Sequence, residues 1–165
     1  MMETPMDRID KILNHALFLY HLGRNNAAEA DRRFCRHSMV HFLDVARLMY
    51  LYNLEDSAGL EKELIYAAAF LHDIGRYEQI AKGTPHDIAS ARMAKTILND
   101  CGFSDRDILA IQDAILHHRG NENHGESHLA RYLYRADKQS RNCFCCPASR
   151  ECNWPLSKKN MEIDY

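Results

Sequence analysis

Apolar residues recur along much of the chain at intervals of three and four, which is the spacing of one helix face. This pattern predicts an amphipathic helix over about 9–20 and a second helix over about 36–53. A third helix is predicted where seven apolar or small residues, 65–71, run directly into His72-Asp73. The hydrophobic pattern of the first half is therefore helical throughout.

Other residues predict where these helices end. The stretch 24–33 is polar and predicts a connection with room for one short helix. Gly75 follows the third helix closely, and a glycine at that place is typical of a helix that ends in a left-handed conformation. We therefore expect a polar loop after the first helix and a left-handed exit after the third.

The second half of the chain contains two sequence signals for the start of a helix. Thr84 and Ser104 each stand three residues before an aspartate, a pattern that satisfies free amides at a helix N-terminus. They predict helices over about 86–101 and 104–118, and apolar periodicity predicts a last helix over about 128–141. No segment alternates long enough to predict a strand. We expect an all-α fold, a single compact helical bundle of about six to seven helices.

Length and charge narrow the class of protein. A chain of 165 residues is most simply one domain, which we place at 1–142, with a cysteine-rich tail at 143–165 packed on it. The 21 basic and 23 acidic residues give a formal net charge of −2, which argues against a basic face for duplex nucleic acid. No apolar run reaches the length of a membrane span, and the polar, acidic start is unlike a signal peptide. These features predict a cytoplasmic protein that does not enter a membrane.

The tail carries an unusual group of cysteines. Thiols stay reduced in the cytoplasm, so the six cysteines of the chain do not predict a disulfide framework. Cys143 and Cys146 have the C-x2-C spacing of a structural zinc or iron–sulfur site, and Cys152 supplies a third thiolate. The fourth ligand stays open between Cys145 and Cys35. The alternative is that these are free thiols, packed as small apolar side chains.

Ten histidines are a second unusual feature, and several share predicted helix ends with aspartates. The set that stands out is spread over five predicted helices: His41, His72, Asp73, His86, His117, His118 and Asp137. Helical bundles build metal sites from inward-facing side chains on several helices. Nitrogen and carboxylate ligands without sulfur suit Mn, Fe, Ni, Co or Zn, and the carboxylates also admit Mg. In the alternative interpretation, Asp73 only pairs with His72 or Arg76 at a helix end.

Five short patterns occur in an order known from one family. Residues 69–76, Ala-Phe-Leu-His-Asp-Ile-Gly-Arg, carry the His-Asp pair, and 41–47 place Val-Ala four and five residues after a histidine. His86 comes next, then 114–118 with two adjacent histidines, then 136–141 beginning with Ala-Asp-Lys. Together these patterns resemble the HD-domain superfamily of metal-dependent phosphohydrolases, whose order is H…HD…H…H…D.

The resemblance implies an all-α fold and a centre for one or two divalent ions. Carried over residue by residue, one ion would be held by His41, His72, Asp73 and Asp137. A second would be held by Asp73, His86 and His118. We prefer His118 to His117, because the family histidine usually lies three residues after an isoleucine, here Ile115. His37 is an alternative to His41 that fits the Val-Ala spacing less well.

The resemblance also implies hydrolysis of a phosphoester by attack of metal-bound water. The expected substrate is a small phosphorylated molecule, with a nucleotide as the leading candidate. Asp73 would bridge the ions, Arg76 would offset charge on phosphoryl oxygens, and His117 would move protons. Alternatively, Arg76 compensates a helix C-terminus and His117 is an ordinary helix-end histidine. The same ligands would serve a di-iron oxygenase or a non-catalytic nucleotide- or metal-sensing module. The sequence does not fix the oligomeric state and leaves an oligomer open.

Overall fold

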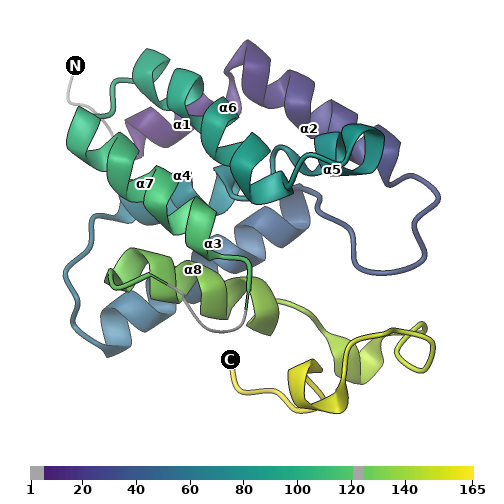
Figure 1. Ribbon diagram of the computed structural model, residues 1–165. Coiled ribbons are helices and arrows are strands. Elements are labelled where there is room, and N and C mark those ends of the chain that lie inside the picture. Colours follow the sequence, from purple (N-terminus) through teal and green to yellow (C-terminus); the bar gives the residue numbers. More distant parts are fainter. Residues whose placement is uncertain (1–5, 121–124) are drawn as a thin grey trace.

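The structure is a computed structural model that describes residues 6–120 and 125–165. These residues form eight α-helices and two short 3-10 helices, with no β-strand in the described ranges (Figure 1). The elements are α1 (Asp7–Leu13), α2 (Ala16–Ala28), α3 (Met39–Glu55), α4 (Lys62–Leu71), α5 (Arg76–Lys82), α6 (His86–Asp100), α7 (Asp105–His117), α8 (His128–Gln139), η1 (Cys143–Cys145) and η2 (Leu156–Lys158). The predicted all-α helical bundle is confirmed. None of the described helices combines the length and apolarity needed to cross a membrane.

The first predicted helix is two helices, because the side chain of His15 interrupts it. Nδ1 of His15 accepts a hydrogen bond from the amide of Leu17, 3.2 Å away, and so caps α2. α2 then continues five residues into the stretch predicted as a polar connection, so that prediction is wrong over its first half. Asn25 explains the difference, because it is buried and its side chain bonds the backbone of Asp73 and of Tyr77, both at 2.8 Å.

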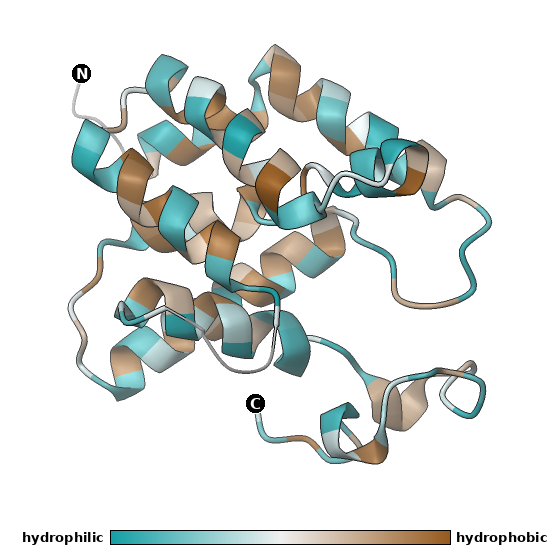
Figure 2. Cartoon of the chain, in the orientation of Figure 1, coloured by the Kyte–Doolittle hydropathy of each residue, from teal (hydrophilic) through white to brown (hydrophobic). Residues whose placement is uncertain are grey.

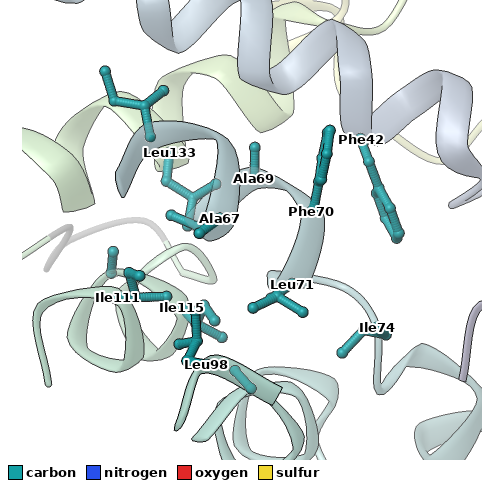
Figure 3. Close-up of a cluster of buried hydrophobic side chains, with 14 of the residues drawn as sticks. Phe42, Ala67, Ala69, Phe70, Leu71, Ile74, Leu98, Ile111, Ile115 and Leu133 are labelled. Atoms are coloured by element: carbon teal, nitrogen blue, oxygen red, sulfur yellow. The ribbon is translucent and has the colours of Figure 1, made fainter. Parts of the chain in front are cut away.

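The apolar helix α4 lies at the centre of the bundle. It packs against α1, α3, α6, α7 and α8, and the fully buried Ala67, Ala68 and Ala69 let these neighbours approach closely. Figure 3 shows buried side chains of α3, α7 and α8 in this cluster: Phe42, Ile111, Ile115 and Leu133. Polar and apolar residues alternate along α6 and α7 in Figure 2, as expected for helices with one face on the core. The core therefore fixes the end of α4, where His72 and Asp73 follow.

Gly75 allows the segment after α4 to pack closely against α6, and it does not end the helix in a left-handed conformation. Its φ is −92°, so the predicted left-handed conformation is wrong. A Cβ at this position would lie 2.7 Å from the Cβ of Ala89 and 2.7 Å from the amide nitrogen of Ser90, both on α6. The amide of Gly75 also donates a hydrogen bond to Oγ of Ser90 at 2.9 Å. α6 therefore holds the segment that carries the His-Asp pair.

The two predicted capping signals have different outcomes. Oγ of Ser104 accepts a hydrogen bond from the amide of Asp107 at 3.2 Å, as predicted. α6 begins at His86, as predicted, but Thr84 makes no capping bond within the described residues. Gln79 of α5 takes over part of that role, because its Oε1 accepts a hydrogen bond from the amide of His86 at 3.1 Å. A long-range contact therefore replaces the predicted local cap.

The segment after α8 folds back on the bundle. Nδ2 of Asn160 donates hydrogen bonds to the carbonyl groups of Lys138, at 2.7 Å, and Arg141, at 2.9 Å. At the C-terminus, the hydroxyl of Tyr165 donates a hydrogen bond to Glu55 of α3 at 3.0 Å. The cysteine-rich tail is thereby tied to both α8 and α3.

Candidate metal centre

Helix ends bring the six predicted ligand residues together. His41 lies in the first turn of α3, His72 and Asp73 follow α4, His86 begins α6, His118 follows α7, and Asp137 lies in the last turn of α8. Five of them are buried and the sixth, Asp137, is partly buried. Their ligand atoms form two groups, within each of which all atoms lie within 4.8 Å of one another.

The first group combines His41, His72, Asp73 and Asp137. Nε2 of His72 lies 3.1 Å from Oδ2 of Asp73 and 3.5 Å from Oδ1 of Asp137. Nε2 of His41 lies 3.2 Å from the same atom of Asp137 and 3.8 Å from Oδ2 of Asp73. Ligand atoms about 2.0–2.2 Å from one ion, at tetrahedral or octahedral angles, lie about 2.8–3.6 Å apart. These four residues therefore fit one ion with little movement.

The second group combines Asp73, His86 and His118. Oδ1 of Asp73 lies 3.3 Å from Nε2 of His86 and 3.4 Å from Nε2 of His118. The two Nε2 atoms are 3.2 Å apart. The three atoms form a nearly equilateral triangle of the size that three ligands of one ion make.

The two oxygens of Asp73 face different groups. Oδ2 faces the first group and Oδ1 the second. Oδ1 of Asp73 and Nε2 of His72 are buried, and neither makes a hydrogen bond within the described residues. A buried polar atom without a partner is costly, and a cation would satisfy both. Geometry and donor set therefore fit a divalent ion in each group, with Asp73 between them.

Each of the four histidines in these groups is anchored through Nδ1, which leaves Nε2 for a metal. The partners are the carbonyl of Ala69 for His72 (2.6 Å), the carbonyl of Ile115 for His118 (2.5 Å), Oγ of Ser140 for His41 (3.2 Å) and Oε1 of Gln79 for His86 (2.6 Å). Such contacts fix the orientation and the tautomer of a metal-binding ring.

Burial and charge set the protonation of the metal-free centre. Burial alone would lower the pKa of His72, but the charges of Asp73 and Asp137 raise it to about 10. Burial alone would raise the pKa of Asp73, but the charge of His72 and other histidines holds it well below its usual range. Burial lowers the pKa of His86 to about 4, so this ring is neutral at pH 7. A proton and a metal ion would therefore compete for Nε2 of His72.

The model of the HD domain family matches residues 39–142, a range that contains all six of these residues. The chain belongs to the HD domain family. It is also 46% identical over 160 residues to an uncharacterized protein of Clostridium beijerinckii, a match that covers 97% of this chain and all of the relative. No solved structure matches significantly.

The two groups of ligand atoms, which we call the HD centre, open into a pocket of about 430 Å³. We call it the HD pocket. Six basic side chains line this pocket: Arg32, Arg76, Arg119, Lys138, Arg141 and Lys158. Asp73 and Asp137 are its acidic residues, and both belong to the metal centre. Phe34 and Trp154 add aromatic surface. A basic lining around a metal centre attracts anions.

Of the two other residues predicted to act on substrate, Arg76 lines the HD pocket and His117 does not. Nη1 of Arg76 lies 2.9 Å from Nδ1 of His86, and its Nε is buried without a hydrogen bond in the described residues. Nδ1 of His117 lies 3.2 Å from Oδ1 of Asp113, one turn earlier on α7. The fold therefore brings Arg76 to the centre and leaves His117 outside the pocket.

Sequence reasoning missed Glu29 and Gln79. Oε1 of Glu29 lies 2.7 Å from Nδ1 of His37, and Gln79 anchors His86 as described above. His37, weighed as an alternative ligand, belongs to neither group, although its Nε2 lies 3.6 Å from Oδ2 of Asp73. No sequence spacing indicated Glu29 or Gln79. Each lies on an element that carries none of the six predicted ligands: Gln79 on α5 and Glu29 just after α2.

Proposed function

We propose that this protein is a metal-dependent phosphohydrolase that cleaves a phosphoester of a small molecule, with nucleotides as the substrate class. One observation carries the proposal. Two groups of metal-ligand atoms share Asp73, and six basic side chains surround them in one pocket. Two neighbouring ions with a basic surround suit the attacking and leaving oxygens of phosphoryl transfer.

The residues of the chain have distinct tasks in this proposal. When bound, divalent ions supply Lewis-acid charge and lower the pKa of the water that attacks phosphorus. Arg76 binds and orients a phosphoryl group, because it lines the pocket and its buried Nε makes no hydrogen bond among the described residues, the carboxylate of Glu29 lying 3.9 Å away. Lys138 has a positioning role, since its Nζ bonds Oδ2 of Asp137 at 2.8 Å and the carbonyl of His118 at 2.6 Å. It thereby joins ligands of both groups.

Aromatic residues in the HD pocket support a nucleotide rather than an aliphatic phosphoester. Phe34 and Trp154 line the same pocket as Arg76, and Phe34 is 39% exposed. A nucleobase stacks on such side chains while its phosphates reach the basic groups. The basic lining also favours phosphate chemistry over a di-iron oxygenase or a metal sensor, neither of which requires an anionic ligand. A non-catalytic nucleotide-sensing module would use the same lining, and release of phosphate distinguishes the enzyme from it.

A phosphate-release screen tests the proposal. The protein would be loaded with Mn, Co, Ni, Fe or Mg and offered nucleoside mono-, di- and triphosphates. We expect release from at least one nucleotide, and a loss of more than about 100-fold in Asp73→Asn, since disturbing even the outer partners of a metal ligand costs 10–100-fold. Asp113→Asn is the matched control, because Asp113 lies on the exposed side of α7. Metal-loaded protein that hydrolyses no nucleotide, or full activity in Asp73→Asn, would overturn the proposal.

A further inference from the structure

A second pocket, of about 390 Å³, lies between the loop that precedes α3 and the C-terminal tail. Five of the six cysteines line it: Cys35, Cys143, Cys145, Cys146 and Cys152. The first of them belongs to the loop and the other four to the tail, two segments that are far apart in the sequence (Figure 1). An ion pair of 2.6 Å between Arg33 and Glu151 also joins the loop to the tail. We call this the cysteine pocket.

Four of these cysteines differ from the fifth in burial. Cys143 is buried, and Cys35, Cys146 and Cys152 are partly buried. Cys145 is exposed, and its thiol donates a hydrogen bond to the carbonyl of Asn142. Burial raises the pKa of the Cys35 thiol, the charge of Arg141 opposes this, and the neighbouring thiols of the other three cysteines add to it. Four cysteines from two segments therefore line one pocket and are at least partly buried, whereas Cys145 is exposed.

Local turns arrange the tail around the cysteine pocket. The amide of Cys146 donates to the carbonyl of Cys143 at 3.3 Å, and the amide of Cys152 donates to Ala148 at 3.0 Å. Nζ of Lys159 bonds the carbonyl groups of Ser149, at 2.6 Å, and Cys152, at 3.3 Å. These bonds order the stretch of tail that carries Cys143, Cys146 and Cys152.

The charges around the cysteine pocket suit a centre held by four thiolates. Its lining contains four basic side chains, Arg33, Arg36, Arg141 and Lys159, against one acidic side chain, Asp44. Thiolates are the form of cysteine that binds a metal, and nearby cations favour that form. A metal centre with four thiolates carries net negative charge, which this lining would offset.

We propose that Cys35, Cys143, Cys146 and Cys152 together ligate an iron–sulfur cluster. Tetrahedral zinc, with Zn–S bonds near 2.3 Å, brings its sulfurs to about 3.8 Å from one another. The compact groups of ligand atoms in the described residues, within 4.8 Å, contain no cysteine. The four sulfurs thus share a pocket without the close approach that a single ion requires. A cluster of several iron and sulfide ions spreads its four cysteines further apart.

The cluster would also fix a wall of the HD pocket. Cys35 of the loop and Cys152 and Trp154 of the tail line both pockets, so both segments contribute to both sites. The cluster would hold Trp154 in place beside the metal centre. Only this last consequence rests on the proposed function, because the ligand assignment stands on the cysteines alone.

Anaerobic purification without chelator tests the proposal. We expect iron together with about two or four acid-labile sulfides per chain, the content of clusters held by four cysteines, and broad visible absorption that dithionite bleaches. Sulfide is the decisive readout, because the His/Asp centre can hold iron but contains no sulfide. Cys35→Ser and Cys146→Ser should each lose sulfide and visible absorption to background. Cys145→Ser, one residue from a proposed ligand, should keep both at the wild-type level.

Three outcomes would overturn the cluster. These are one equivalent of zinc in place of iron, no sulfide even after anaerobic reconstitution with iron and sulfide, or full sulfide content in Cys35→Ser. Helical circular dichroism of each variant checks that it has folded, and the wild-type sulfide measurement does not depend on any variant. Because phosphate release is a separate assay, failure of the cluster and failure of the phosphohydrolase proposal can be distinguished.

Discussion

His37 and Glu29 form a buried pair beside the metal centre. Nδ1 of His37 lies 2.7 Å from Oε1 of Glu29, and the amide of His37 donates to Oε2 of Glu29 at 2.7 Å. Nε2 of the same ring lies 3.6 Å from Oδ2 of Asp73 and lines the HD pocket. His37 therefore lies between Glu29, which is outside the centre, and Asp73, which both groups of ligand atoms share.

Replacing Glu29 with glutamine should slow the reaction without removing metal. Burial would raise the pKa of Glu29, but its bonds and charge interaction with His37 lower it, so the wild-type side chain is ionised at pH 7. Glu29→Gln keeps the shape but weakens its hold on the ring. We expect a loss of about 10–100-fold in kcat/KM, the range for disturbed surroundings of a metal ligand, because the ring of His37 lies 3.6 Å from Oδ2 of Asp73, with unchanged metal content. Glu61→Gln, on an exposed ion pair with Arg8, is the control. Equal rates in both variants would contradict the role of the pair.

The stability of the metal-free protein should fall as pH rises from 6.5 to 10. The pKa of His72 is raised from 6.5 to about 10, so its stabilising contribution is full below pH 6.5 and is lost as pH rises through 10. The loss should reach a few kcal/mol, since one pKa unit corresponds to about 1.4 kcal/mol. Metal-loaded protein should lack this loss, because an ion replaces the proton. Urea unfolding of the metal-free and metal-loaded protein from pH 6.5 to 10 measures the free energy of unfolding. If it changes with pH in the same way in both forms, the raised pKa of His72 is not its cause.

Gly75→Ala should destabilise the fold at the centre. The added Cβ would meet the backbone of α6 at Ser90, where there is no flexible group to yield. We expect a cost of about 1–3 kcal/mol, typical of overpacking, and weaker metal binding as the His-Asp segment shifts. Gly23→Ala is a control of opposite sign, because Gly23 lies within α2 with nothing near its Cβ position. Thermal unfolding of the two variants tests the contrast, and destabilisation of equal size in both would contradict it.

The arrangement of helix ends around the centre could be predicted, but the residues that support it could not. His41, His72, Asp73, His86, His118 and Asp137 carry local patterns in a fixed order, and all six come together as expected. Asn25 and Gln79 have no such pattern, since their roles depend on hydrogen bonds to other elements of the fold. The break between α1 and α2 was hidden, because apolar spacing continues across the cap at His15. Gly75 was misread because local sequence does not show how closely α6 approaches.

Gln79→Ala should weaken the second group more than the first. Oε1 of Gln79 lies 2.6 Å from Nδ1 of His86, which belongs to the second group alone. Freeing that ring should lower metal affinity there by about 10–100-fold. Metal titration followed by calorimetry should show a marked weakening of one binding event and a smaller change in the other, because the two positions share Asp73. Gln112→Ala removes a bond to the carbonyl of Ala91, away from the centre, and should leave both events unchanged. Equal weakening of both events in Gln79→Ala would contradict the separate assignment.

Trp154→Ala should raise KM for nucleotides with little change in kcat. A base stacked on an aromatic side chain contributes about 1–3 kcal/mol, which corresponds to a rise in KM of about 5- to 150-fold. A small aliphatic phosphoester, which cannot stack, should show no such rise. Phe144→Ala is the control, because Phe144 is an exposed aromatic of the tail that lines a different pocket. Steady-state kinetics measure KM for the nucleotide and for the aliphatic phosphoester in each variant. An equal rise in KM for both substrates in Trp154→Ala would refute base stacking.

Asp73 gives one oxygen to each group of ligand atoms, so two ions bound as proposed would be thermodynamically linked. Filling one position changes the charge and the freedom of the carboxylate that the other must use. By linkage, each ion alters the affinity of its neighbour by the same factor in both directions. A metal titration of this protein would then depart from two independent sites. Metal supply would set the proportions of empty, half-filled and fully loaded chains jointly rather than site by site.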